Sequence, residues 1–214
     1  MVDAARQPLI EVKTYTEVEK VEGFVGNFKV TLREKSKYVR ADRCNGCGDC
    51  AKVCPIEIPN YFEMNLAPRK AIYIPMSQSV PLIYTVDLDA CIHCYKCVEA
   101  CGALQAIDFS MQDKIVEEDI GAIVVATGFS HFDPTPMEEY GYNHYPNVIT
   151  AMEMERLNNS AGPTSGRLIR PSDGKVPQKL AFINCVGSRD KRFNPGCSNF
   201  CGTLPSLEIG RAHV

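Results

Sequence analysis

Cys44-Asn-Gly-Cys47-Gly-Asp-Cys50-Ala-Lys-Val-Cys54-Pro55 is the first half of an internal repeat, and its second half is Cys91-Ile-His-Cys94-Tyr-Lys-Cys97-Val-Glu-Ala-Cys101. Both halves, called the first run and the second run below, have the spacing C-x2-C-x2-C-x3-C. A tight loop can present the first three thiolates of a run from one side. The fourth thiolate lies a helical turn further on, so it points away from the other three. This geometry favours two four-thiolate sites that exchange their fourth cysteine.

The residue type and the spacing together indicate two [4Fe–4S] clusters. In bacterial two-cluster ferredoxins, a run of this spacing gives three cysteines to one cluster and the fourth to the other. The alternatives are a zinc site, which needs only two cysteine pairs, and a disulfide framework, which is typical of small secreted chains. The predicted ligands are Cys44, Cys47, Cys50 and Cys101 for one cluster, and Cys91, Cys94, Cys97 and Cys54 for the other.

Composition and charge limit the class of function. The chain has 214 residues, of which 45% are hydrophobic and 23% charged, as expected for a globular protein of one or two domains. A net charge of −3 gives no sign of a nucleic-acid-binding surface. Residues 1–6 lack the basic and apolar regions of a signal peptide, and the apolar stretch 120–129 is too short to span a bilayer. Together with eleven cysteines in metal-type groups, these features predict a cytoplasmic location without direct membrane insertion.

Hydrophobic patterning predicts strands on both sides of the repeat and within it. These strands cover residues 9–14, 28–33, 71–74, 83–87, 106–109 and 114–118. The run 121–129 is continuously apolar and is predicted as a buried parallel strand, and residues 179–187 are predicted as a second buried strand. Between them, residues 149–158 have helical spacing, and residues 160–178 form a linker rich in Pro, Gly and Ser.

The tripeptide Ala126-Thr127-Gly128 at the end of the first apolar run is similar to the second flavin-contact motif of disulfide-reductase-type flavoproteins. The alternative is an ordinary buried strand that ends in a glycine turn. The strand order around the repeat favours the flavin interpretation. The predicted fold class is therefore α/β, a fragment of a disulfide-reductase-type FAD/NAD-binding domain with an inserted α+β two-cluster [4Fe–4S] ferredoxin domain.

The predicted domain organisation follows the same order along the chain. Residues 1–35 are assigned to strands of the FAD domain, 36–111 to the inserted ferredoxin domain, 112–178 to the return to the FAD domain and a linker, 179–207 to the start of a second Rossmann-like segment with a cysteine motif, and 208–214 to a sequencing-adapter artefact. No Gly-x-Gly-x-x-Gly turn for a flavin pyrophosphate is present, so the chain is expected to start inside the flavin domain.

Several stretches together resemble one flavoprotein family. They are residues 23–30, the two cysteine runs, and residues 69–73, 126–129, 162–164, 170–174 and 185–190. On these stretches the chain is similar to the CoB–CoM heterodisulfide reductase iron–sulfur subunit (HdrA) family of methanogens, which has relatives in other anaerobes. The resemblance covers residues 1–201.

The resemblance implies an oxidoreductase subunit that takes part in flavin-based electron bifurcation. In that family, FAD receives two electrons from a hydrogenase or formate dehydrogenase partner and sends one of them to a low-potential ferredoxin. The two clusters would conduct electrons between FAD and the redox partners, and other heterodisulfide reductase subunits would cleave the heterodisulfide. The alternatives are a related subunit of a quinone-linked complex of sulfur or sulfate metabolism, and a stand-alone ferredoxin-like electron carrier.

Cys185, Cys197 and Cys201 lie outside the repeat. The resemblance implies that cysteines of this region serve a further cluster near the flavin, through a Cys-Ser-x-x-Cys-Cys motif. Here Gly202 follows Cys201, so one ligand of that motif is missing. The alternative is three free thiols that behave as small hydrophobic side chains.

Overall fold

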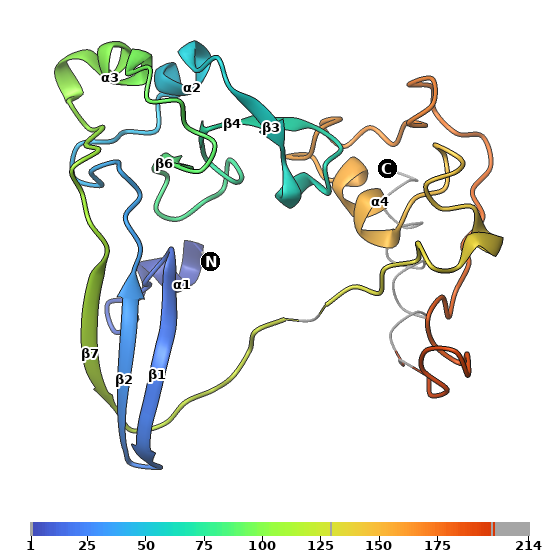
Figure 1. Cartoon of the computed structure of the whole chain (residues 1–214), viewed down its shortest axis with the longest axis horizontal. Coiled ribbons are helices and arrows are strands. Elements are labelled where there is room, and N and C mark those ends of the chain that lie inside the picture. The colour runs from blue at the N-terminus through green and yellow to red at the C-terminus, as the bar shows by residue number, and fades with distance from the viewer. Residues whose placement is uncertain (1, 129, 198, 200–214) are drawn as a thin grey trace. The chain divides into compact units, whose positions relative to one another are not determined.

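The computed structural model describes residues 2–128, 130–197 and 199 (Figure 1). The chain forms two compact units, of which unit 1 comprises residues 1–58 and 68–127 and unit 2 comprises residues 59–67 and 128–214. Both cysteine runs belong to unit 1. A short excursion of the chain between the two runs, residues 59–67, belongs to unit 2.

Unit 1 holds most of the regular secondary structure among the described residues. Its elements are α1 (Val2–Arg6), β1 (Thr16–Phe24), β2 (Asn27–Glu34), α2 (Asp49–Val53), β4 (Pro68–Lys70), β5 (Ile72–Tyr73), β6 (Thr85–Val86), α3 (Lys96–Cys101), the 3-10 turn η2 (Gly102–Leu104) and β7 (Lys114–Ile120). The strand β3 (Glu57–Pro59) pairs with β4 across the excursion. Unit 2 contains the 3-10 turns η1 (Tyr61–Glu63) and η3 (Glu138–Tyr140) and the helix α4 (Ala151–Asn158).

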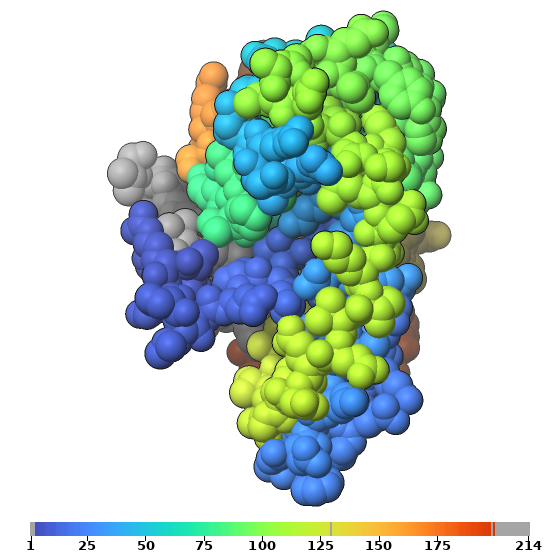
Figure 2. Space-filling view, turned by 90° about the vertical axis from the view of Figure 1, so that its left-hand side faces the viewer, coloured from blue at the N-terminus to red at the C-terminus, as the bar shows by residue number. Residues whose placement is uncertain are grey.

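The segments before and after the repeat join in one antiparallel sheet of order β1-β2-β7. Val30 in the central strand lies opposite Val21 on one side and Glu118 on the other. Within unit 1, this sheet extends away from the cysteine-bearing module (Figures 1 and 2). The predicted strands 28–33 and 114–118 are therefore confirmed, with slightly wider bounds.

The predicted strand 9–14 is wrong, because β1 lies further along the chain at Thr16–Phe24. Both segments contain alternating residues, but only β1 is joined to β2 by a two-residue loop. Gly26 in that loop has φ +91°, a left-handed conformation that tight hairpin loops require. Residue Leu9 is 97% exposed instead.

The module between β2 and β7 has a small core to which both cysteine runs contribute. Val39, Ile72, Val86 and Ile107 are buried there together with Cys50 and Cys97, and the helices α2 and α3 pack against each other. The predicted strands 71–74 and 83–87 form as the two-residue pair β5 and β6. The predicted strand 106–109 is reduced to a single bridge between Val39 and Ile107.

The predicted strands 121–129 and 179–187 do not form among the described residues. Residues 121–128 have no regular structure and are exposed, with Val124 at 90% and Val125 at 78%. The run 179–187 is likewise without helix or strand. A buried parallel strand needs hydrogen-bonded neighbours on both sides, and no described strand lies beside either run. Apolar residues alone therefore did not produce these strands.

Unit 2 is organised around α4, which confirms the predicted helix at 149–158. Thr150 and Glu153 form a capping box, in which each side chain accepts a hydrogen bond from the other residue's backbone N–H group. The predicted linker 160–178 contains no helix or strand. In the part of the chain that the structure describes, no helix has the length and apolar character to cross a membrane.

The excursion 59–67 is held against α4 by a buried ion pair. The Arg156 guanidinium donates hydrogen bonds to both carboxylate oxygens of Glu63, over 3.0 and 2.9 Å. The guanidinium also lies over the Phe62 ring, 4.7 Å from its centroid. Arg156 and Glu63 are only 7% and 6% exposed. This pair links residues 93 positions apart within unit 2.

Candidate iron–sulfur centre

The two cysteine runs fold into loops of the same conformation. Each loop contains two left-handed residues at equivalent positions, which are Gly46 and Gly48 in the first run and His93 and Tyr95 in the second. The second residue of each pair is the N-cap of a short helix, α2 or α3. The left-handed residues turn the chain back on itself, so that the first three cysteines of a run follow one tight loop.

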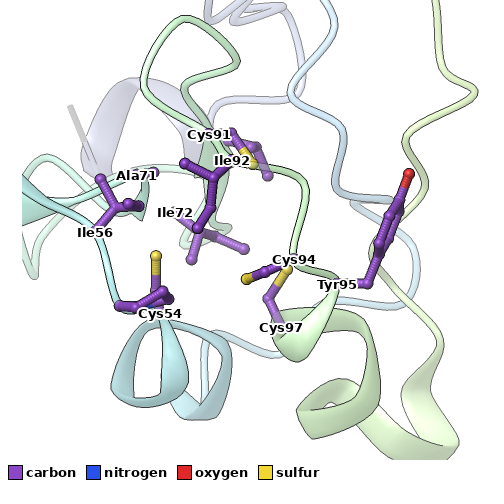
Figure 3. Close-up of a pocket in the computed structure, with 11 residues that line it drawn as sticks. Cys54, Ile56, Ala71, Ile72, Cys91, Ile92, Cys94, Tyr95 and Cys97 are labelled. Atoms are coloured by element: carbon purple, nitrogen blue, oxygen red, sulfur yellow. The ribbon is translucent and has the colours of Figure 1, made fainter.

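One pocket gathers cysteines from both runs. It is lined by Cys54 of the first run and by Cys91, Cys94 and Cys97 of the second. Figure 3 shows the sulfur atom of Cys54 pointing into the pocket from the end of α2, while Cys94 and Cys97 lie across the space from it. The other lining residues are Pro55, Ile56, Ala71, Ile72, Val86, Ile92 and Tyr95. We call this site the second-run pocket.

The first three cysteines of the first run are also close together. Burial, together with smaller contributions from charge on Cys44 and Cys47, raises the pKa of the Cys50 thiol to about 12. Cys101 packs against the same core as Cys44, and its sulfur accepts a hydrogen bond from the Ala106 N–H group over 3.3 Å. We call Cys44, Cys47 and Cys50, together with Cys101 as their predicted fourth ligand, the first-run site.

The predicted donors at both sites are cysteine thiols, the ligand type that holds iron–sulfur clusters. The ten cysteines within the described residues are all free of disulfides. Among the described residues, no three His, Cys, Asp or Glu side chains converge as a single ion would require. In a zinc site each thiolate sulfur lies about 2.3 Å from the ion. An iron–sulfur cube is wider than a single ion, so its four thiolate sulfurs lie further apart.

A segment that leads into β6 lies against the first loop. A Cβ atom placed on Gly46 would come within 3.0 Å of the Leu82 carbonyl oxygen, and one on Gly48 within 3.0 Å of the Tyr84 hydroxyl. Burial raises the pKa of Tyr84, and the neighbouring thiols of the first run raise it further. The sequence pattern predicted a strand here but not this contact, because no spacing rule relates Tyr84 to a loop that lies far earlier in the chain.

The second loop contributes two of its own side chains to an aromatic group. The ring centroids of His93 and Tyr95 lie 5.5 and 5.4 Å from that of Phe109, and Tyr38 is 6.4 Å from Phe109. The group lies on the outer side of the loop, where His93 and Tyr95 are exposed. The two loops thus share a backbone conformation but have different side-chain surroundings.

The residues predicted to contact a flavin are not part of this site. Ala126, Thr127 and Gly128 belong to the exposed segment that has no strand partner. Gly128 has φ +78°, and a Cβ atom placed on it would meet nothing within 4 Å.

Of the three cysteines outside the repeat, the structure describes two. Cys185 is half-buried with φ +64°, and Cys197 is exposed and accepts a hydrogen bond from the Asn199 N–H group over 3.4 Å. Cys201 lies outside the described residues. The predicted further cluster at these positions is therefore not addressed by the described geometry.

Comparison with known proteins shows what the module and the chain are similar to. Residues 43–107 match the family model of the 4Fe-4S dicluster domain. The CoB–CoM heterodisulfide reductase iron–sulfur subunit HdrA of Methanocaldococcus jannaschii is 52% identical over 202 residues, and one of two such subunits of Methanopyrus kandleri is 55% identical. The corresponding subunit of the H2/formate:CoB-CoM heterodisulfide,ferredoxin reductase of Methanococcus maripaludis is 50% identical.

These matches cover 94% of the present chain but only 30–31% of the length of the three relatives. The similarity extends well beyond residues 43–107, so it includes the flanking sheet and unit 2 as well as the module. The chain is thus an iron–sulfur protein with a dicluster ferredoxin domain, homologous to the iron–sulfur subunit HdrA of the heterodisulfide reductases.

Proposed function

We propose that this chain holds two [4Fe–4S] clusters and conducts electrons through them one at a time. The first-run site would hold one cluster with Cys44, Cys47, Cys50 and Cys101, and the second-run pocket the other with Cys91, Cys94, Cys97 and Cys54. The observation that carries the proposal is the pocket that Cys54 shares with three cysteines of the other run. This exchange of the fourth cysteine is what the spacing of the runs requires.

The protein residues would do three things for such clusters. Their thiolates bind iron, which requires eight thiols to lose their protons, so cluster assembly releases protons. Backbone N–H groups stabilise the negative sulfur atoms, as His93 does for Cys91 over 3.4 Å. The buried apolar side chains of Ala71, Ile72 and Val86 line one wall of the second-run pocket and would keep water from the cluster on that side. The clusters themselves supply one-electron chemistry.

A stand-alone electron carrier is the simpler alternative, and the sheet argues against it. In a stand-alone carrier the segments outside the module would be independent decorations. Instead, β2 before the module and β7 after it pair along their whole length, from Phe28 opposite Ile120 to Glu34 opposite Lys114. This continuous pairing supports a module inserted into a larger domain.

In the whole protein, we propose that the clusters conduct between FAD and redox partners in a cytoplasmic heterodisulfide reductase complex. Ala126, Thr127 and Gly128 would contact the flavin there. The names of the relatives mention H2, formate and ferredoxin, so a hydrogenase, a formate dehydrogenase and a ferredoxin are the proposed partners, together with the other reductase subunits. Electron bifurcation at FAD is proposed for the whole protein and not for these 214 residues alone.

Anaerobic reconstitution tests the proposal, with iron and sulfide analysis and EPR of the reduced protein. We expect about eight iron and eight sulfide per chain, the content of two cubes. Cys54→Ser should lose one of the two cluster signals, whereas Cys197→Ser, which changes a cysteine outside the repeat, should keep both. Zinc without an iron signal, or equal effects of the two variants, would contradict the proposal.

A further inference from the structure

The two sites differ in the side chains that surround them. The second-run pocket is lined by cysteine and apolar side chains, and by Tyr95. Figure 3 shows the Tyr95 oxygen directed away from the four cysteines of the pocket. Its ring instead packs edge-on against Phe109, at 5.4 Å between centroids. The pocket therefore receives no side-chain hydrogen-bond donor from its described lining.

The first-run site has a side-chain donor beside it. The Tyr84 hydroxyl lies against Gly48, between Cys47 and Cys50, at 3.0 Å from the position that a Cβ atom would take. Gly48 is buried and has φ +88°, so the hydroxyl occupies the space that its missing side chain leaves. Cys50 and Cys47 also lie close enough for their charge to raise the pKa of Tyr84, so the hydroxyl lies beside the thiols of the first run.

Backbone N–H groups donate to sulfur atoms at both sites. Ala106 donates its N–H group to Cys101 of the first-run site over 3.3 Å, and His93 donates to Cys91 of the second-run pocket over 3.4 Å. The loops also have the same backbone conformation. The side-chain difference between the sites is therefore the hydroxyl beside the first run, which has no counterpart among the described lining residues of the second-run pocket.

We propose that Tyr84 is the hydrogen-bond donor that makes the first-run site the one of higher reduction potential, an inference that rests on the proposed function. Reduction adds one negative charge to a cluster. A hydroxyl donor to the sulfur atoms stabilises that charge and raises the potential, and surroundings without polar groups lower it. Tyr84 is thus a positioning residue for charge rather than a ligand.

A difference in reduction potential between the two sites sets the direction in which electrons move within the module. An electron on the second-run side would move to the first-run side, so that one site is oxidised and the other reduced by one electron. No further reactant is needed for this step. Partners that donate electrons would then be served from the second-run side, and acceptors from the first-run side.

The test is a potentiometric titration of the reconstituted 214-residue chain, followed by EPR. We expect two distinct midpoint potentials, and Tyr84→Phe should lower the higher one while leaving the other in place. Tyr95→Phe removes a hydroxyl that points away from the second-run pocket and should change neither potential. Cys94→Ala, which removes a ligand of the second-run pocket, should abolish the lower-potential signal and so assign it.

Each result decides between the proposals. If Tyr84→Phe changes neither midpoint potential, or shifts both equally, the role of Tyr84 is overturned. The proposed function is left intact by that result, because both clusters are still present. Loss of the higher-potential signal in Cys94→Ala would reverse the assignment and overturn the inference. Failure of the parent chain to form any cubane signal would overturn the proposed function and this inference with it. Iron content, measured for every variant, separates a shifted potential from a lost cluster.

Discussion

At the scale of single residues, the left-handed positions in the two loops govern how the cysteines are presented. The first run uses Gly46 and Gly48 there, and the second uses His93 and Tyr95. Glycine adopts positive φ without steric penalty, whereas other residues incur a conformational cost. In the second run the two side chains instead gain packing against Phe109. The two loops therefore share one backbone conformation for different reasons. Glycine adopts it without strain in the first loop, and side-chain packing offsets the strain in the second.

Gly48→Ala should destabilise unit 1 more than Gly26→Ala does. The two glycines have nearly equal φ values, +88° and +91°, so the backbone strain of about 1 kcal/mol is shared. Only the Cβ atom at position 48 meets a neighbour, the Tyr84 hydroxyl at 3.0 Å, while position 26 has nothing within 4 Å. Overpacking should cost about 1 kcal/mol more, measurable by urea unfolding.

The double variant Gly48→Ala with Tyr84→Phe provides the control. Removal of the hydroxyl opens the space into which the new methyl group points, so part of the additional loss should be recovered. Equal losses for the two glycine variants, with no recovery in the double variant, would show that the hydroxyl does not crowd this position.

At the scale of elements, α4 is short and depends on its N-terminal cap. Thr150 Oγ1 accepts a hydrogen bond from the Glu153 N–H group over 3.2 Å, and a Glu153 carboxylate oxygen accepts one from the Thr150 N–H group. The helix buries Met154 and Leu157 on one face. A helix of eight residues is marginal by itself, so the cap and this packing together determine its stability.

Thr150→Ala should lower the free energy of unfolding of unit 2 by about 1 kcal/mol, because one backbone N–H group at the helix start loses its acceptor. Thr150→Ser keeps a hydroxyl in the same place and should lose much less. Hydrogen exchange of the α4 amides measures the effect locally. If serine and alanine are equally destabilising, the loss comes from the threonine methyl group and not from the cap.

The ion pair between Arg156 and Glu63 should contribute far more than the exposed pairs of the same unit. Arg156→Ala leaves a buried carboxylate without its partner, and we expect a loss of about 3 kcal/mol. Arg170→Ala removes an exposed pair with Asp173 and should cost less than about 1 kcal/mol. The losses of the two arginine variants are compared by urea unfolding and by hydrogen exchange of the α4 amides. Similar losses for both arginines would contradict the buried role of Arg156.

At the scale of the whole molecule, the chain divides into two units that have different sources of stability. The core of unit 1 around the repeat includes Cys50 and Cys97, which are cluster ligands in the proposed function. Unit 2 relies on α4, the ion pair with the excursion 59–67 and buried side chains such as Met137. Metal binding contributes directly to folding wherever the ligands lie in the core.

Cluster incorporation should therefore protect one unit selectively. We expect hydrogen exchange to slow in α2, α3, β5 and β6 of the anaerobically reconstituted chain, relative to the same chain after treatment with a chelator and ferricyanide. Exchange in α4 should change little. A uniform change across both units would show that they fold as one cooperative block, contrary to their separate cores.

The sequence alone determined the local features of this protein. Eight cysteines at a repeated spacing predict the cluster ligands, glycine and turn residues place the loops, and the helical spacing of residues 149–158 places α4. Such features depend on residues within a turn or two of each other, so spacing rules read them directly. The ligand assignment stays a prediction, while α4 and the strands at 28–33 and 114–118 are confirmed.

Only the tertiary structure decided which distant segments meet. The contact of Tyr84 with Gly48 and the pair of Glu63 with Arg156 could not be read from spacing. The apolar run 121–128 shows the converse, since its composition predicted a buried strand and it lies exposed. The reason is physical: a strand or a buried charge is stable only when another segment supplies its hydrogen-bond partners, and the chain's own local pattern does not specify that segment.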